Sequence, residues 1–270
     1  MRDALVSTIA LAAIATPAAE ACGRNTDCVI GGRTYRIVFP EGHDGTTPIG
    51  AIVFSHWFRG TAKDVMRYEP LTALASELGV AFIAAQAAGP DWNIPGAPSH
   101  HAQAGIDELA YFDALIEDVT ARFAIDRTRL VVSGFSSGAM MVWHLACYRG
   151  ASFAGFVPMS GTFWAPVPET CPTGPVNLIH YHGTEDTVVP LTGRQVKDGR
   201  QGNVFEAIEM IARTGGYRPV ETGETPGLQC SRQQADGGKL LELCLFAGKH
   251  ELKVWQLART WRIFEASKGG

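Results

Sequence analysis

The sequence has little excess of either charge. Its 270 residues carry 27 acidic and 23 basic side chains, a formal net charge of −4 with histidine neutral. The two signs are mixed along the chain, so no basic stripe indicates nucleic-acid binding and no polybasic cluster indicates a membrane surface. The chain also lacks internal repeats, low-complexity segments and interdomain linkers. We therefore expect one large domain with an ordinary core.

An apolar run near the N-terminus, from Ala4 to Ala15, is too short to span a bilayer. A basic residue precedes it, and the segment Ala-Glu-Ala before Cys22 offers small residues at positions −3 and −1 of a cleavage site. This pattern predicts a signal peptide over residues 1–21 and a single catalytic domain over residues 22–270. An ordinary N-terminal helix and a lipoprotein acylated at Cys22 are the alternatives. Export predicts a secreted or periplasmic protein without stable membrane insertion.

The six cysteines include no C-x-x-C pair, so a zinc site or a thioredoxin-like motif is not indicated. Six cysteines in an exported chain favour disulfides, whereas six buried thiols would fit a cytosolic protein. Proximity in the sequence suggests the pairs Cys22–Cys28, Cys147–Cys171 and Cys230–Cys244.

Apolar runs suited to strands alternate with segments of helical periodicity. The expected strands are Arg33–Phe39, Ile49–Ser55, Val80–Ala85, Leu130–Val132, Gly155–Met159, Val176–His180 and Leu240–Phe246. The expected helices are Asp64–Leu78, Ile106–Phe123, Ala139–Tyr148, Val204–Arg213 and Val254–Ser267. This alternation predicts an α/β fold with a mostly parallel, doubly wound sheet, whose reactive groups collect in loops at the carboxyl ends of the strands.

The segment Arg129–Gly138, RLVVSGFSSG, organises the site. It joins an apolar strand to a helix through G-x-S-x-G, with Ser136 at the centre. Strand, tight turn and helix are the context of a nucleophile elbow, which exposes a serine hydroxyl above the sheet. The flanking glycines let the strand and helix backbones pass closely. A serine-rich turn without chemistry is the alternative.

A serine nucleophile needs a base within hydrogen-bond reach and an acid that orients the base. In the α/β-hydrolase arrangement the chain order is serine, acid, histidine. Of the eight histidines, only His250 follows the acidic candidates that lie after Ser136, and it sits in the loop after a predicted strand. We predict Asp186 as the acid because it directly follows the strand Val176–His180. The alternatives are Glu185, Asp198 and Asp236.

The oxyanion of a tetrahedral intermediate needs two donors. The backbone N–H of Ser137 is one candidate, and an N–H of Trp57 or Phe58, in the loop after Ile49–Ser55, is the other. For His56 we favour a structural bond to loop backbone over proton transfer.

With these residues in view, the sequence resembles the exported α/β-hydrolases grouped as polyhydroxybutyrate depolymerases and related feruloyl esterases. The matching segments are GGRTYRIVFP at 31–40, DWN at 91–93, RLVVSGFSSGAMM at 129–141 and HGTEDTVVPLTG at 182–193. The resemblance implies that Ser136, Asp186 and His250 are nucleophile, acid and base, and that Trp92 and Asn93 lie near the substrate entrance.

The sequence departs from the family pattern at two places. His56 is followed by Trp57 where the family usually has glycine, which would narrow the acyl pocket or change which N–H points inward. His250 lies in Ala247–Leu252 rather than in a glycine-rich stretch.

Five aromatic residues, two of them predicted substrate contacts, lie in loops expected to rim the site: Trp57, Phe58, Trp92, Phe163 and Trp164. They would form an aromatic cleft for a phenolic or polyester chain, with Trp92 and Trp164 as substrate contacts, or they would pack the loops onto the body. His100 with His101, or His180 with His182, lacks a clear third metal ligand, so we expect no metal. We expect no cofactor, because a serine triad supplies nucleophile, base and oxyanion stabilisation from the protein itself.

The sequence as a whole predicts an exported serine esterase acting on feruloyl-type esters or hydroxyalkanoate oligomers through an acyl-serine intermediate. A serine peptidase or acyltransferase on the same fold is one alternative. A non-catalytic binding protein on a hydrolase scaffold is another. The expected partner is a small or oligomeric ester, and the oligomeric state is left open.

Overall fold

The computed structural model describes residues 22–100 and 104–267. The predicted signal peptide over residues 1–21 and His101 lie outside these ranges. Within them, ten strands form one sheet in the order β1-β2-β4-β3-β5-β6-β7-β12-β11-β10.

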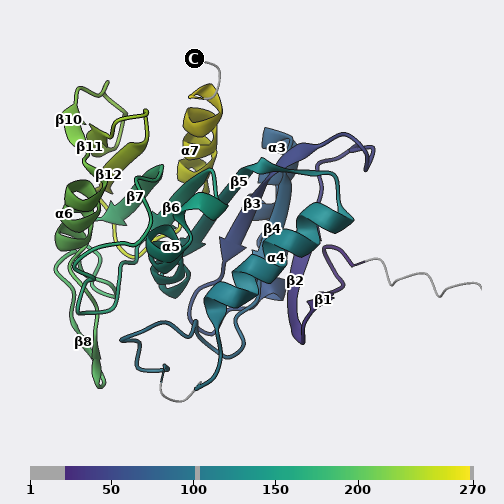
Figure 1. The fold of residues 1–270 in the computed structure, drawn as a ribbon, viewed down its shortest axis with the longest axis horizontal. Helices are drawn as coiled ribbons and strands as arrows, with labels where there is room; N and C mark the ends of the chain where they lie inside the picture. Colours follow the sequence, from purple (N-terminus) through teal and green to yellow (C-terminus); the bar gives the residue numbers. More distant parts are fainter. Residues whose placement is uncertain (1–21, 101–103, 268–270) are drawn as a thin grey trace, which may run out of the picture.

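The centre of the sheet is parallel and its edges are antiparallel (Figure 1). The parallel strands are β4 (Ala81–Ala85), β3 (Ile49–Ser55), β5 (Ile125–Phe135), β6 (Gly155–Met159), β7 (Leu178–Gly183) and β12 (Leu240–Phe246). The edge strands are β1 (Cys28–Ile30), β2 (Arg33–Val38), β11 (Gln229–Gln234) and β10 (Arg218–Val220). A separate hairpin pairs β8 (Gln195–Val196) with β9 (Gly199–Arg200). The predicted mostly parallel sheet is confirmed, and so is the strand expected over Arg33–Phe39, which is β2. The short strands β1, β10 and β11 and the hairpin were not predicted.

Helices cover both faces of the sheet (Figure 1). On one face lie α4 (Glu108–Arg122), α5 (Ser137–Tyr148) and α6 (Val204–Gly215). On the other lie α1 (Ala62–Arg67), α2 (Glu69–Thr72), α3 (Leu74–Leu78) and α7 (Val254–Ala266). Side chains alternate across a strand, so Ala51 and Val53 of β3 join the first core while Ile52 and Phe54 join the second. The continuous apolar run of β3 is explained by this double burial.

Capping residues define the helix ends. Asp107 begins α4 by accepting the Ala110 N–H at 3.0 Å, and Asn203 begins α6 by accepting the Phe205 N–H.

The single helix predicted over Asp64–Leu78 is wrong, because the segment forms the three short helices α1, α2 and α3. Pro70, in the first turn of α2, explains the break between α1 and α2, since a proline inside a continuous helix removes one hydrogen bond and clashes with the preceding turn.

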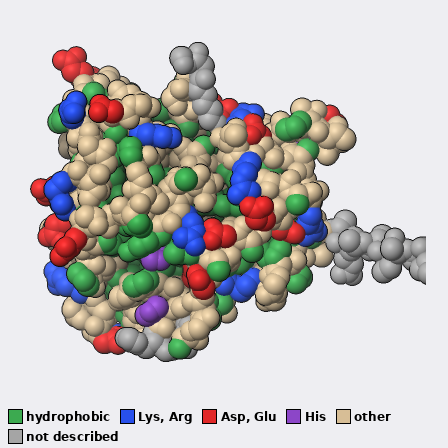
Figure 2. All heavy atoms as spheres, in the orientation of Figure 1, with side chains coloured by type: hydrophobic (Ala, Val, Ile, Leu, Met, Phe, Trp, Pro, Cys, Tyr) green, Lys and Arg blue, Asp and Glu red, His purple; other side chains and the backbone are tan. Residues whose placement is uncertain are grey.

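All three predicted disulfides are present: Cys22–Cys28, Cys147–Cys171 and Cys230–Cys244. The last pair joins directly opposed residues of β11 and β12. Acidic and basic side chains are mixed over the face of the molecule in Figure 2, as the sequence predicted. Among residues 22–100 and 104–267, no helix has the length and apolarity needed to cross a membrane.

Candidate active site

The turn between β5 and α5 holds Ser136 in a strained backbone conformation. Ser136 has φ 59° and ψ −121°, a region that residues other than glycine rarely adopt. Its N–H donates to the Met159 carbonyl on β6 at 3.0 Å, and its carbonyl accepts the N–H groups of Ala139 and Met140. These bonds from a neighbouring strand and the following helix maintain the strain. The chain thus contains the strand, sharp turn and helix expected of a nucleophile elbow.

Glycines are required around the turn because backbones pass there at close range. A Cβ on Gly134 would lie 2.4 Å from the Gly138 carbonyl oxygen. A Cβ on Gly138 would lie 2.0 Å from the Ser55 carbonyl oxygen, and one on Gly161 would lie 2.3 Å from that of Ser136. The glycines of the motif therefore bring α5 against β5 and against the end of β3, as the sequence suggested.

Asp186 lies in the turn after β7, and its carboxylate is fully buried. Oδ1 accepts the backbone N–H groups of Val188 at 2.9 Å and Val189 at 2.8 Å. Oδ2 accepts the Nδ1–H of His250 at 2.7 Å. Burial alone raises the pKa of Asp186, but the nearby imidazole groups of His182 and His250 outweigh burial and hold this pKa well below its usual range. Asp186 is therefore an ionised partner for the imidazole.

The loops carrying Asp186 and His250 are bonded to each other. The Thr184 N–H donates to the Phe246 carbonyl and the Glu185 N–H to the Gly248 carbonyl, both at 2.9 Å. A Cβ on Gly183 would lie 2.4 Å from the Gly248 carbonyl oxygen, so the two backbones are in close contact. Parallel pairing of β7 with β12 brings both loops to one edge of the sheet, which sets the separation of the acid from the histidine.

His250 also packs against the residue before the nucleophile. The rings of His250 and Phe135 have centroids 4.7 Å apart, and the His250 side chain is 15% exposed. Phe135 ends β5 and directly precedes Ser136. The structure thus places the Asp186–His250 pair beside the elbow. Direct contact between the Ser136 hydroxyl and the imidazole stays a prediction.

The other acids considered from the sequence lie elsewhere. Glu185 is exposed, and Asp198 is exposed in the turn between β8 and β9. Asp236 is exposed and lies 3.8 Å from Arg218. The 2.7 Å bond to His250 therefore favours Asp186 among the four acids.

The loop after β3 is held by buried contacts of His56. Its side chain is fully buried, with Nδ1 2.9 Å from the Trp57 carbonyl oxygen and Nε2 accepting the Ala87 N–H at 3.1 Å. Burial lowers the pKa of His56. This geometry agrees with the structural role favoured from the sequence. In the same loop, Trp57 is half-buried and Phe58 is 51% exposed. The backbone N–H of Ser137, the first residue of α5, and that of Trp57 or Phe58 stay the predicted oxyanion donors.

Sequence comparison places this geometry in a family. The chain is 30% identical over 204 residues to a probable feruloyl esterase C of Aspergillus terreus, covering 70% of this chain and 71% of the relative. The chain belongs to the feruloyl esterase-like α/β-hydrolases. A family described as Phospholipase/Carboxylesterase matches residues 91–209. The protein is a carboxylic ester hydrolase.

A second relative and a solved structure are also similar to this chain. A putative esterase, NocK, of Nocardia uniformis is 27% identical, covering 66% of this chain and 52% of the relative. The solved structure of an acetyl xylan esterase from Aspergillus awamori superimposes with a TM-score of 0.62 at 17% identity, covering 86% of this chain and 94% of the other. At that identity the superposition supports the fold alone.

Two residues predicted as substrate contacts of this esterase have other roles. Trp92 has no exposed surface, and its indole N–H donates to the His56 carbonyl at 2.8 Å while the ring packs against those of His56 and Phe112. Asn93 is buried, and its amide donates to the Ile106 carbonyl at 2.6 Å. These contacts support the loops from within, so a direct substrate contact by Trp92 or Asn93 is not supported.

The predicted aromatic rim is also mostly buried. Trp164 is 8% exposed and forms an isolated β-bridge with Gln201, and Phe163 is 4% exposed and packs against Trp143. Phe58 is the large aromatic of this group that remains well exposed. Packing of long loops onto the body, the alternative weighed from the sequence, explains Phe163 and Trp164.

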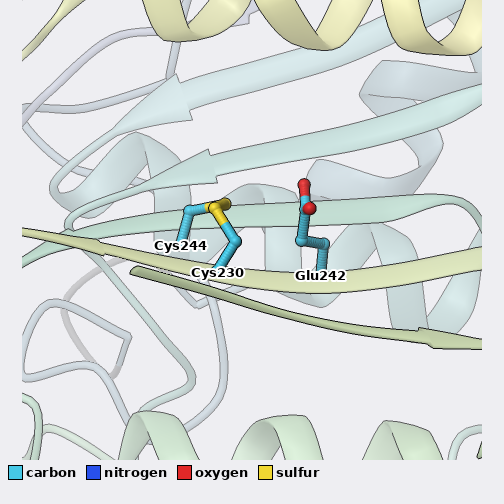
Figure 3. A group of neighbouring side chains, drawn as sticks. All are labelled: Cys230, Glu242 and Cys244. Atoms are coloured by element: carbon cyan, nitrogen blue, oxygen red, sulfur yellow. A yellow bond between two sulfur atoms is a disulfide. The ribbon is translucent and has the colours of Figure 1, made fainter. Parts of the chain in front are cut away.

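One group of side chains in the described ranges has the spacing of a metal site: Cys230, Glu242 and Cys244 (Figure 3). The two sulfurs form a disulfide, so neither is a thiolate ligand. The Glu242 carboxylate is paired with Arg232 at 2.9 Å and with Arg259 at 3.0 Å. This group is accounted for without a metal.

The sequence considered His180 and His182 only as metal ligands. In the structure both are fully buried on β7 and bonded to each other, and His182 lies 3.4 Å from Asp186 Oδ2. Their spacing of two on a strand, ending four residues before the acid, was a signal that they share a face leading to Asp186.

Proposed function

We propose that the chain is an exported serine esterase that cleaves carboxylic esters through an acyl-Ser136 intermediate. The observation that carries this proposal is the 2.7 Å bond between buried Asp186 and His250, whose ring packs on Phe135 next to the strained Ser136. An ionised acid bonded to Nδ1 leaves Nε2 as the basic nitrogen of a neutral imidazole. That tautomer is the one that can accept a serine proton.

In the proposed reaction, His250 takes the hydroxyl proton as Ser136 Oγ attacks the ester carbonyl carbon. The oxyanion is stabilised by the N–H of Ser137 and by that of Trp57 or Phe58. The intermediate collapses, the carbon–oxygen bond to the alcohol breaks, and imidazolium returns the proton to the leaving alkoxide. Water, deprotonated by His250, then releases the acid and restores Ser136. Asp186 stabilises the imidazolium in both stages, and no cofactor is needed.

The proposed substrates are feruloyl-type esters or oligomers of hydroxyalkanoates. Several relatives carry the name feruloyl esterase, including proteins from Aspergillus terreus and Emericella nidulans. The three disulfides support a secreted or periplasmic location, since such bonds persist in oxidising compartments. A peptidase or acyltransferase on the same fold, and a non-catalytic binding protein, are the alternatives that the experiment addresses.

The experiment compares a panel of p-nitrophenyl esters of increasing acyl length, methyl ferulate and hydroxybutyrate oligomers with peptide anilides. Ser136→Ala is compared with Ser231→Ala, a change at an exposed serine on the edge strand β11. We expect ester hydrolysis by wild type and Ser231→Ala, and a loss of about 10⁴-fold or more in kcat for Ser136→Ala. Cleavage confined to anilides, or no labelling of folded wild type by a fluorophosphonate probe, would contradict the proposal.

A further inference from the structure

Two buried histidines lie behind the Asp186–His250 pair, and the proposed mechanism uses neither. His180 and His182 both belong to β7 and share one face of the sheet. His180 Nε2 lies 2.9 Å from His182 Nδ1, and His182 Nε2 lies 2.7 Å from the Val189 carbonyl oxygen. His180, His182, the Val189 carbonyl and Asp186 thus form a continuous chain of contacts from the core of the sheet to the turn that carries the acid.

The partners of these rings assign their protons. A carbonyl oxygen only accepts, so the 2.7 Å contact with Val189 places an N–H of His182 on Nε2. The 2.9 Å contact between His182 Nδ1 and His180 Nε2 shares one proton, which we assign to His180 Nε2. Burial, reinforced by the neighbouring His182, lowers the pKa of His180 well below its usual value, so His180 is neutral and has a single N–H to donate.

The distances show how His182 acts on the acid. The bond to the Val189 carbonyl is short, whereas Asp186 Oδ2 lies 3.4 Å from the same nitrogen and receives a weaker, mainly electrostatic interaction. Val189 also gives its own N–H to Asp186 Oδ1 at 2.8 Å. His182 therefore binds Val189, the residue whose N–H holds the Asp186 carboxylate. It thereby fixes the turn after β7 from the side of the strand.

We propose that His182 is a positioning residue for the catalytic acid and that His180 fixes the tautomer in which His182 does this. The proposal rests on the acyl-serine mechanism of the preceding subsection. Without the Nε2–H donor, the buried Val189 carbonyl loses its partner and the turn loosens. The Asp186 carboxylate then shifts relative to His250, and a displacement of about 1 Å at such a group lowers the rate about 100-fold.

Two substitutions at one position separate this role from simple packing. In His182→Gln the side-chain amide nitrogen reaches the place of Nε2, whereas in His182→Asn it reaches only the place of Nδ1. We expect His182→Asn to lower kcat about 10- to 100-fold with KM nearly unchanged. His182→Gln should retain kcat within about threefold of wild type, because one hydrogen bond is restored. The low-field proton resonance of the Asp186–His250 bond should be lost in the first variant and kept in the second.

The matched control is His144→Gln, at a half-buried histidine on α5 whose ring packs against that of Tyr148. If His182→Asn does not fold, His180→Gln and His180→Leu replace the two His182 variants. Only His180→Gln keeps a side-chain N–H that can donate to His182 Nδ1. Equal kcat for the two members of the folded pair, or a loss confined to KM, would overturn the proposal. The proposal would also be overturned if the loss of kcat in the His182 variants were in the same proportion to the loss of Tm as in His144→Gln. Active Ser136→Ala would instead overturn the mechanism itself.

Discussion

At Gly138, α5 packs directly against the end of β3, and one added methyl group there tests how the site is built. In Gly138→Ala the new Cβ would lie 2.0 Å from the Ser55 carbonyl oxygen and 2.6 Å from that of His56. An ordinary contact between carbon and oxygen is about 3.3 Å or longer. Both oxygens belong to the backbone and cannot rotate away, so the helix and the loop after β3 must separate by about 1 Å.

This separation has a cost in stability and a cost in rate. Overpacking of a core commonly costs about 1–3 kcal/mol, and here backbone must move, so we expect about 3 kcal/mol of lost unfolding free energy. For a protein of this size that corresponds to a fall in Tm of about 6–12 °C. The same movement displaces the loop that carries the N–H groups of Trp57 and Phe58, so kcat should fall about 100-fold in the molecules that remain folded.

The assay measures Tm by circular dichroism and kcat on p-nitrophenyl acetate well below the melting transition. The matched control is Gly174→Ala, because a Cβ on Gly174 meets no atom within 4 Å and the residue has no positive φ. Its unfolding free energy should stay within about 0.5 kcal/mol of wild type. If Gly138→Ala matched Gly174→Ala in both Tm and kcat, the close approach of α5 to the loop after β3 would not be what sets the site.

Three further predictions concern the acid, a buried histidine and the loop support. Asp186→Asn should lower kcat by about four orders of magnitude, whereas Asp198→Asn, at an exposed turn, should leave it unchanged, as steady-state kinetics will show. Burial lowers the pKa of His144 to about 4. Between about pH 6.5 and pH 4, the unfolded chain therefore binds a proton at His144 and the folded chain does not. The free energy of unfolding should therefore fall as pH drops through that window, and urea titrations should show a smaller fall for His144→Gln. Trp92→Phe removes the donor to the buried His56 carbonyl and should lower kcat about tenfold, with KM on a short ester little changed.

Local patterns in the sequence were sufficient for the central strands of the sheet. The expected strands Ile49–Ser55, Gly155–Met159 and Leu240–Phe246 agree residue for residue with β3, β6 and β12. Ile49–Ser55 and Gly155–Met159 are almost wholly apolar, and such runs suit strands that helices cover on both faces. Leu240–Phe246 is apolar except for Glu242. The one helix predicted wrongly, Asp64–Leu78, contains Pro70, and its apolar spacing had been given more weight than the proline.

Side chains in the long loops were harder to place. Trp92 and Trp164 were expected at the entrance, yet both are buried, because aromatic residues in loops are also the means by which loops pack onto the body. The loop sequences have no periodicity, so residue spacing cannot distinguish an aromatic residue that contacts substrate from one that packs the loop onto the body. The indole bond from Trp92 to the His56 carbonyl joins residues 36 positions apart, a relation that only the folded chain contains.

The sequence alone determined the α/β class, the strand–turn–helix around Ser136, the disulfide pairs suggested by proximity and the one histidine in the order that a triad requires. These follow from local periodicity, turn chemistry and chain order, which need no knowledge of distant contacts. Tertiary structure decided that Asp186 rather than Asp198 or Asp236 meets His250. It also decided that His180 and His182 are bonded to each other and lead to Asp186. The reason is physical: parallel pairing of β7 with β12 sets which loops meet, and that pairing joins segments about 60 residues apart.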